Sequence, residues 1–185
     1  MRELSLHILD IVQNAIAAGA SLVTIEIHEQ RDRDLLSISV TDDGCGMPEE
    51  LRKSVSDPFT TTRSSRKVGL GIPMMKASAI RSGGDLSIRS ELGKGTELSA
   101  TYRLDHIDRP PLGDIAETMI TLVAGNPKGP DFVLHYRVDE REYAFDTRPI
   151  RSALGEVPLT AAEVLAWMRN HLKEGIQDLH GGAQI

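Results

Sequence analysis

Four short motifs follow one another along the N-terminal part of the chain and constrain the fold more than any other sequence feature. The first is a polar pair one helical turn apart, and the other three contain glycine. In chain order they are Asp10 with Asn14, Asp42 to Gly46, Gly69 to Gly71, and Gly93 to Thr96. A single glycine cluster usually marks an ordinary turn. The order of the four, with a helix or strand pattern beside each, predicts that they build one common pocket.

Helix and strand patterns alternate around these motifs. Apolar residues recur at helical spacing from Leu4 to Ala18, with Gly19 as the expected C-cap. Strand-like alternation covers residues 22–28, 35–41, 85–90 and 96–104, and a second helix is predicted over 71–82. The stretch 43–66 has few core residues and many turn formers. We therefore expect an α+β sandwich, in which helices cover one face of a mixed, mainly antiparallel sheet.

A boundary is expected near residues 105–111, where the strand pattern stops and Arg109-Pro110-Pro111 intervenes. We predict an N-terminal domain over residues 1–104 and a small α+β C-terminal subdomain over residues 105–185. Its patterns predict a helix over 113–123, a hairpin of residues 132–138 and 142–147, and a closing helix from Thr160 to about Leu179. Thr160 and Glu163 have the spacing of a capping box.

The aromatic residues of the C-terminal hairpin have two readings. We expect them to pack onto the first domain, and a surface that binds a partner is the alternative. Trp167 is expected in the core or at an interface. The sequence assigns no chemistry to residues 105–185, and His106 with Asp108 lacks the companions of a metal site.

Composition excludes several classes of protein. The net charge of −6 argues against a general nucleic-acid-binding or anionic-membrane-binding surface. No stretch approaches the roughly 18 consecutive apolar residues of a membrane span. The single cysteine, Cys45, excludes an internal disulfide and fits a reducing compartment. The N-terminal residues lead into an amphipathic segment rather than a signal peptide, so a cytoplasmic protein is expected.

Asp10 and Asn14 lie one helical turn apart, on the polar face that also carries Glu3 and His7. A carboxylate and an amide oxygen at this spacing can converge on one Mg²⁺, which prefers hard oxygen ligands and completes its shell with water or phosphate. The alternative is a solvated helix face, and for two isolated residues that alternative is favoured. The later motifs reverse this preference.

Asp42 ends a predicted buried strand and is followed at once by glycines. Its carboxylate can accept a hydrogen bond from an exocyclic amine such as adenine N6. Gly44 and Gly46 allow the backbone to approach a flat ring, and Met47 offers a polarisable apolar surface for it. A strand that simply ends in an Asp-Gly turn is the alternative.

The third motif is suited to binding phosphate groups, and the fourth is typical of a hairpin turn. Gly69-Leu70-Gly71 opens a helix, whose first N–H groups and dipole favour phosphate. Upstream of it, Arg63, Arg66 and Lys67 could cover a triphosphate as a lid. Gly93 to Thr96 is by itself a plain hairpin turn, although Thr96 could bond a nucleotide. For the third motif, the alternative is a basic loop beside a helix cap.

Together the motifs resemble the GHKL superfamily, the Bergerat-fold ATP-binding module of histidine kinases, anti-sigma-factor serine kinases, type II topoisomerases, MutL and Hsp90. Residues 10–14 match its N box, 42–47 its first glycine box, 57–62 its F box, 69–72 its second and 93–96 its third glycine box. The resemblance spans residues 1–104. The F box and the run of Gly69-Leu70-Gly71 into a helix are most similar to histidine kinases, whereas residues 14–21 and 42–47 are also similar to MutL.

The resemblance implies ATP and Mg²⁺ as cofactors. Asn14 would be the Mg²⁺ ligand, Asp42 the adenine-binding residue and Thr96 its neighbour, and Asp10 takes the position of a catalytic glutamate as a candidate base or metal helper. The remaining nucleotide-binding residues would be Gly44, Gly46, Met47, Thr62, Arg63, Lys67, Gly69, Leu70 and Gly71.

The sequence departs from the family pattern at three points. Asp10 is one methylene shorter than glutamate, which puts its reach to an attacking water or hydroxyl in doubt. Ala17 stands where histidine kinases often have a phosphate-contacting Lys or Arg. The chain begins at the N box, so no dimerisation and phosphoacceptor helices precede it, and a stand-alone module is expected. His7 is read as a packed or solvated side chain rather than a phosphoacceptor.

Three functions follow from the resemblance. The first is an ATP-dependent regulatory protein kinase in signalling, similar to anti-sigma serine kinases or histidine kinases. The second is a nucleotide-gated interaction switch with little turnover, which Asp10 and Ala17 favour. The third, a slow ATPase of the MutL or Hsp90 kind, is the least favoured. All three imply a protein partner and permit a homodimer, and none requires nucleic acid or a membrane.

Overall fold

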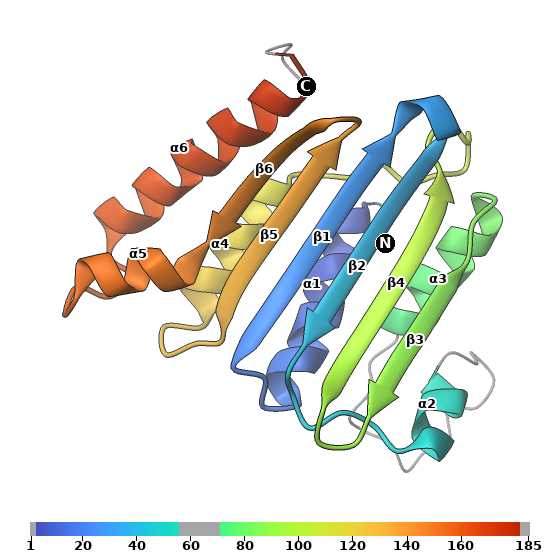
Figure 1. Cartoon of the computed structure of the whole chain (residues 1–185), viewed down its shortest axis with the longest axis horizontal. Helices are drawn as coiled ribbons and strands as arrows, with labels where there is room; N and C mark the ends of the chain where they lie inside the picture. Colours follow the sequence, from blue (N-terminus) through green and yellow to red (C-terminus); the bar gives the residue numbers. More distant parts are fainter. Residues whose placement is uncertain (1–2, 56–70, 182–185) are drawn as a thin grey trace.

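One six-stranded sheet forms the centre of the molecule, and helices lie behind it in the view of Figure 1. The computed structural model describes residues 3–55 and 71–181. The strand order is β3-β4-β2-β1-β5-β6, and every neighbouring pair is antiparallel except β1 with β5. The strands are β1 (Leu22–Gln30), β2 (Leu35–Asp42), β3 (Leu86–Glu91), β4 (Gly95–Arg103), β5 (Asp131–Val138) and β6 (Arg141–Asp146). The α+β class and the mixed, mainly antiparallel sheet are thereby confirmed.

The helices that cover the sheet are α1, α3 and α4 (Figure 1). The described helices are α1 (Leu4–Ala17), α2 (Glu49–Val55), α3 (Gly71–Arg81), α4 (Ile115–Gly125), α5 (Thr147–Leu154) and α6 (Ala162–Leu179), with a short 3₁₀ turn at Arg31–Arg33. In Figure 1, α6 lies beside the β6 edge and α2 near the end of β3. Helix α1 buries Leu4, Ile8 and Val12 at helical spacing, as the sequence predicts.

The first helix ends at Ala17 with Ala18 as its C-cap, so the predicted cap at Gly19 is one residue too late; Gly19 follows the cap with a φ of +75°. The Gly19 N–H donates to the Ile16 carbonyl at 3.0 Å, and the Ala20 N–H donates to the Ala15 carbonyl at 3.1 Å. These two bonds satisfy carbonyls that the helix end would otherwise leave free.

Alternation along the strands explains why, among the described residues, α1, α3 and α4 all cover the same face of the sheet. In β1 the side chains of Val23, Ile25 and Ile27 are buried, while Glu26 between them is exposed. Strand β2 buries Leu36, Ile38 and Val40 in the same way, with serines between them. Because successive side chains point to opposite faces, the apolar set lies against the helices and the polar set lines the open face.

The C-terminal part of the chain continues this sheet. β5 pairs in parallel with β1, and β6 pairs with β5. Phe132, Tyr136 and Phe145 are buried in one core shared with the N-terminal strands, so the expected packing of the aromatic hairpin is confirmed. The division into domains of residues 1–104 and 105–185 stays a prediction about folding units, because one sheet spans both.

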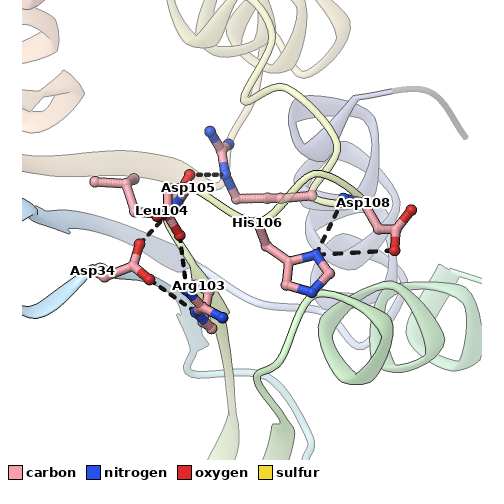
Figure 2. Close-up of polar contacts among 7 residues, drawn as sticks. Asp34, Arg103, Leu104, Asp105, His106 and Asp108 are labelled. Carbon is pink, nitrogen blue, oxygen red and sulfur yellow. Dashed lines mark hydrogen bonds and ion pairs between the residues drawn. The ribbon is translucent and has the colours of Figure 1, made fainter.

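An ionic cluster holds the chain where it leaves β4 (Figure 2). The Arg103 side chain donates to the carboxylates of Asp34 at 2.8 Å and Asp105 at 3.2 Å, and the Asp105 N–H donates to Asp34 at 2.8 Å. The hydrogen bond from the Asp105 backbone, followed by that from Arg103, lowers the pKa of Asp34 to about 2. The start of β2 and the end of β4 are thus joined to the connection toward α4.

Some local predictions were wrong or incomplete. Helices α2 and α5 were not predicted, and α4 begins at Ile115, with Asp114 as its N-cap, rather than at Gly113. The N-cap of α6 is Ala161 without a side-chain hydrogen bond, so Thr160 and Glu163 form no capping box. Trp167 is not a core residue, since 53% of its surface is exposed while its ring stacks on His171.

No helix within the described ranges has both the length and the apolar character that crossing a bilayer demands.

Candidate functional site

A cavity of about 180 Å³ lies where α1, the end of β2 and the start of β4 meet. It brings together Asn14 from the first motif, Asp42 and Gly46 from the second, and Thr96 from the fourth. The full lining comprises Ile11, Asn14, Ala15, Ala17, Ala18, Val40, Asp42, Cys45, Gly46, Met47, Leu51, Ile72, Thr96 and Leu98. Three of the four motifs therefore contribute to one pocket. Of the third motif, Gly69 and Leu70 lie outside the described residues and Gly71 is not in the lining, so its part in the shared pocket stays a prediction.

Asp42 is the last residue of β2, paired with Thr96 on one side. Its carboxylate Oδ1 accepts a hydrogen bond from the Gly44 N–H at 2.8 Å. Burial raises the pKa of Asp42, and backbone hydrogen bonds from Gly44 and Thr96 partly offset this effect. A half-buried acceptor of this kind is suited to a neutral donor such as an amine, whose hydrogen bond compensates for lost hydration.

Gly46 is required by backbone conformation and by space. Its φ is +63°, which L side chains rarely adopt, and a Cβ there would lie 2.1 Å from the Glu91 carbonyl oxygen. The loop of residues 43–47, called here the glycine loop, consequently packs against the β3–β4 turn without an intervening side chain. Its Cys45 carbonyl accepts a hydrogen bond from the Gly93 N–H at 2.8 Å. The second and fourth motifs are therefore in direct contact.

Ser90 fastens the far end of the glycine loop and was not predicted as a site residue. The Ser90 Oγ accepts a hydrogen bond from the Met47 N–H at 2.8 Å and donates to the Gly95 carbonyl at 3.0 Å. Since its single proton goes to that carbonyl, the Thr96 hydroxyl 2.9 Å away acts as donor to Ser90. The Thr96 oxygen keeps its lone pairs for a ligand. A serine on the strand before Gly93 was the only sequence signal.

Asn14 and Asp10 occupy different surroundings. Asn14 is half-buried and lines the cavity, whereas Asp10 is exposed and outside its lining. Asp10 lies beside the first residue of α3, because a Cβ on Gly71 would be 2.8 Å from the Asp10 Cβ and 3.2 Å from its Oδ2. Within the described ranges, no cluster of three or more His, Cys, Asp or Glu could hold a metal by itself. A cation bound at Asn14 would need further oxygen atoms, supplied by a bound phosphate-containing molecule or by water.

His7 does not lie on a solvated polar face with Asp10. Only 2% of its surface is exposed, and burial lowers the pKa of its ring. The packed histidine of the two alternatives is thus the one observed.

Residues 2–106 match a known family. The model of the family described as "Histidine kinase-, DNA gyrase B-, and HSP90-like ATPase" matches residues 2–106, which is more than half of the chain and includes every motif. The chain belongs to this ATPase family.

Relatives with related sequences match about half to three fifths of this chain. A "Putative sensor protein" of Shewanella frigidimarina is 31% identical over 105 residues, covering 55% of this chain and 16% of the relative. "Sporulation kinase C" of Bacillus subtilis is 34% identical over 88 residues, covering 48% and 20%. "Sensor protein kinase FleS" of Pseudomonas aeruginosa is 36% identical over 110 residues, covering 60% and 27%. The matched region is thus a small share of each relative.

A solved structure extends the likeness of fold beyond this region. The chain described as "Crystal Structure of N terminal domain of a DNA repair protein" superposes with a TM-score of 0.54 at 12% identity. The superposition covers 80% of this chain and 53% of that one. It therefore includes residues outside the part that the ATPase family model matches.

Five of the predicted site residues have no described position relative to the cavity. Thr62, Arg63, Lys67, Gly69 and Leu70 lie outside the described residues, as does the F box at 57–62. The described remainder of the predicted set consists of Asp10, Asn14, Asp42, Gly44, Gly46, Met47, Gly71 and Thr96. Of these, Asn14, Asp42, Gly46, Met47 and Thr96 line the cavity, and Asp10, Gly44 and Gly71 lie next to residues that do.

A larger cavity of about 780 Å³ lies at the opposite end of β1 from the glycine loop. It is lined by Glu29, Tyr136, His180 and residues at the start of α4 and the end of α6. No described residue of the ATPase-family motifs is in its lining. The convergence of those motifs, rather than cavity size, identifies the smaller cavity as the candidate site.

Proposed function

We propose that this chain binds Mg²⁺-ATP in the cavity beneath the glycine loop and supplies the phosphoryl donor of a signalling protein kinase. One observation carries the proposal. Asp42 and Asn14, which come from separate motifs, lie on the walls of one small cavity together with Met47 and Thr96.

The adenine end would be the wall formed by Asp42 and the glycine loop. An acceptor at Asp42 complements the N6 amine of adenine, whereas guanine carries a carbonyl oxygen at that position. Val40, Met47 and Leu98 supply apolar surface for the ring. ATP should therefore bind more tightly than GTP.

The metal end would be α1. The Asn14 amide oxygen is a hard ligand, and phosphate oxygens would complete the shell of Mg²⁺. The start of α3 lies beside Asp10, and a helix start favours negative charge. Because Asp10 is itself negative, the triphosphate would approach this end only with the cation between them.

The kinase assignment rests on the relatives. Two of those named above carry "kinase" in their names and two carry "sensor", and the matched part is 16–27% of their lengths. The phosphoryl acceptor would be a protein partner or a second copy of the chain. The proposed location of this activity is the cytoplasm.

A nucleotide-gated switch with little turnover is the second candidate. The observation that favours it is the position of Asp10, which is exposed and outside the cavity lining. A base that does not reach the reacting hydroxyl leaves chemistry slow, while binding is retained. A slow ATPase would share this geometry.

Titration calorimetry with Mg²⁺-ATP tests nucleotide binding. Asp42→Ala should weaken the affinity by about 10- to 100-fold, because a hydrogen bond to a charged group contributes about 1.5–3 kcal/mol. The control is Asp32→Ala, which removes an exposed carboxylate from the Arg31–Arg33 turn and should leave affinity unchanged. Equal affinity of Asp42→Ala and wild type would refute the adenine assignment.

The single cysteine gives a second readout of the same site. Cys45 is exposed and lines the cavity, so bound nucleotide should slow its reaction with a thiol reagent. Asn14→Ala should bring the affinity measured with Mg²⁺ close to that measured in a chelator. A Mg²⁺ effect as large as in wild type would remove Asn14 from the metal site.

Asp10→Asn separates the kinase from the switch. Under the kinase proposal, transfer of labelled phosphate to a protein should be lost while Mg²⁺-ATP binding persists. Under the switch alternative, no transfer is seen in wild type, and ATP-dependent capture of a partner is the same in wild type and variant.

A further inference from the structure

The Asp43 side chain accepts three hydrogen bonds that tie the glycine loop to the start of β1, and its backbone N–H donates to the Leu22 carbonyl at 3.4 Å. Its Oδ1 accepts from the backbone N–H of Ser21 at 2.7 Å and from that of Leu22 at 2.9 Å. Its Oδ2 accepts from the Ser21 hydroxyl. These bonds span more than 20 positions of sequence and converge on one exposed carboxylate. Such a set restrains the backbone far more than a single surface contact does.

The restraint acts on the loop that forms the wall of the proposed adenine site. Asp43 directly follows Asp42, the last residue of β2. Two residues later, the Cys45 N–H donates to the Ala18 carbonyl at 2.9 Å. With Ser90 holding Met47 at the other end, the glycine loop is fixed at its beginning, middle and end. Asp43 supplies the side-chain anchor at the beginning.

Ser21, to which Asp43 is hydrogen-bonded, is also held by a hydrogen bond from the C-terminal part of the chain. The Ser21 carbonyl accepts a hydrogen bond from the Asp131 N–H at 2.9 Å, where β5 begins. The Asp131 carboxylate in turn accepts from the Thr147 hydroxyl at 2.8 Å and from Arg151 Nε at 3.0 Å, both in α5. Ser21 is therefore held between Asp43 and β5. This connects residues 131–151, which the family match leaves out, to the glycine loop.

We infer that Asp43 is a positioning residue for nucleotide recognition: it fixes the glycine loop against Ser21 and Leu22, so that Asp42 is held at the height of the adenine amine. The inference rests on the proposed function for its ligand. Asp43 itself is outside the cavity lining. Its contribution comes from preorganisation, since a displacement of about 1 Å in a recognition group lowers efficiency by about 100-fold.

Asp43→Asn and Asp43→Ala distinguish positioning from charge. In Asp43→Asn the amide oxygen still accepts both backbone N–H groups, and the NH₂ group donates to the Ser21 hydroxyl. Asp43→Ala loses all three bonds. The affinity for Mg²⁺-ATP should therefore fall about tenfold or more in Asp43→Ala and return to within about twofold of wild type in Asp43→Asn.

The reaction rate of Cys45 with Ellman's reagent, measured without nucleotide, reports on the loop itself. It should rise about threefold or more in Asp43→Ala, because a loop released from Ser21 gives the reagent freer access around the thiol at the cavity wall, and stay near wild type in Asp43→Asn. Asp114→Ala is the matched control: it removes a carboxylate that caps α4 and should change neither readout. Ser21→Ala, which removes only the hydroxyl donor, should give an intermediate rate if Asp43→Ala does not fold.

Unchanged Cys45 rates and affinity in Asp43→Ala would overturn the inference, as would an Asp43→Asn variant as impaired as Asp43→Ala. If wild type binds no nucleotide, the proposed function fails, and the Cys45 rates still decide whether Asp43 anchors the loop.

Discussion

Gly46→Ala perturbs the glycine loop at the position where it touches the β3–β4 turn. The added methyl would lie 2.1 Å from the Glu91 carbonyl oxygen and 3.0 Å from that of Gly95, both backbone atoms that cannot rotate away. The φ of +63° adds about 1–2 kcal/mol for an L residue. Relieving the overlap adds about 1–3 kcal/mol, the range for an overpacked site. We therefore expect a loss of roughly 2–5 kcal/mol of stability.

Gly46→Ala should also change the shape of the cavity and weaken nucleotide binding. An ordinary contact of 3.4 Å with Glu91 requires the loop to move by about 1.3 Å. Gly46 and Met47 both line the cavity, so this shift displaces one wall relative to Thr96 on the other. We expect the affinity for Mg²⁺-ATP to fall by about 100-fold, the effect of an error of about 1 Å in placement.

Gly93→Ala is the matched control for this prediction. Gly93 has a φ of +79°, but a Cβ there meets nothing within 4 Å, so only the conformational cost of about 1–2 kcal/mol applies. In thermal unfolding, a loss of 1 kcal/mol lowers Tm by about 2–4 °C for a chain of this size. Gly93→Ala should lose about 2–8 °C with little change in nucleotide affinity, and Gly46→Ala should lose more in both. Equal losses of Tm in the two variants would refute the argument from the Glu91 contact.

Three further measurements test other parts of the molecule. The folded-state pKa of Asp34, about 2, lies below its ordinary value of 3.8, so its stabilising contribution is complete above about pH 4 and is lost as pH falls toward 2. Asp34→Asn should accordingly flatten the decline of Tm between pH 4 and 2, and an unaltered decline would contradict this. Phe145→Ala should cost about 3–5 kcal/mol and lower one single transition, because the ring belongs to the shared core; two separated transitions in calorimetry would instead favour independent domains. Asp114→Ala should cost about 1 kcal/mol through loss of the hydrogen bond from the Glu117 N–H, which a Tm equal to wild type would exclude.

The spacing of apolar residues predicted those helices and strands in which buried side chains recur at regular intervals. Val23, Ile25 and Ile27 alternate along β1, and the apolar positions of α1 recur every three or four residues, so each pattern had one reading. The cavity was predicted for a different reason. It was predicted from the order of the motifs. The glycines of Asp42 to Gly46 were expected to let the backbone approach a flat ring, and the structure shows in addition that Gly46 lies close to the β3–β4 turn.

The missed helices are short and only partly buried. Helix α5 has one buried residue, Thr147, and its start is fixed by Asp146, whose carboxylate accepts from the Arg148 N–H at 2.9 Å. Helix α2 runs from Glu49 to Val55 with charged residues over much of its length. Seven or eight residues give too few turns for a helical period to stand out. Ser90 was missed because its role depends on Met47, which lies 43 positions away in the sequence.

The sequence pattern could not predict that the C-terminal hairpin joins the main sheet, because this position depends on strand direction. β4 runs antiparallel to β2, β2 antiparallel to β1, and β1 parallel to β5, so β4 and β5 point the same way. Two strands with the same direction need a crossover connection, which α4 provides on the covered face of the sheet. An alternating hairpin by itself is equally consistent with a separate sheet.

The burial of the apolar residues of β5 depends on the register in which β5 pairs with β1. Phe132, Leu134 and Tyr136 are buried in the observed register, and a slip of one residue would turn all three toward the open face. The same register sets the hydrogen bond from the Asp131 N–H to the Ser21 carbonyl, and Ser21 carries the anchor of the glycine loop. The apolar residues of β5 that secure its pairing therefore also secure one wall of the candidate nucleotide site, although none of them lines it.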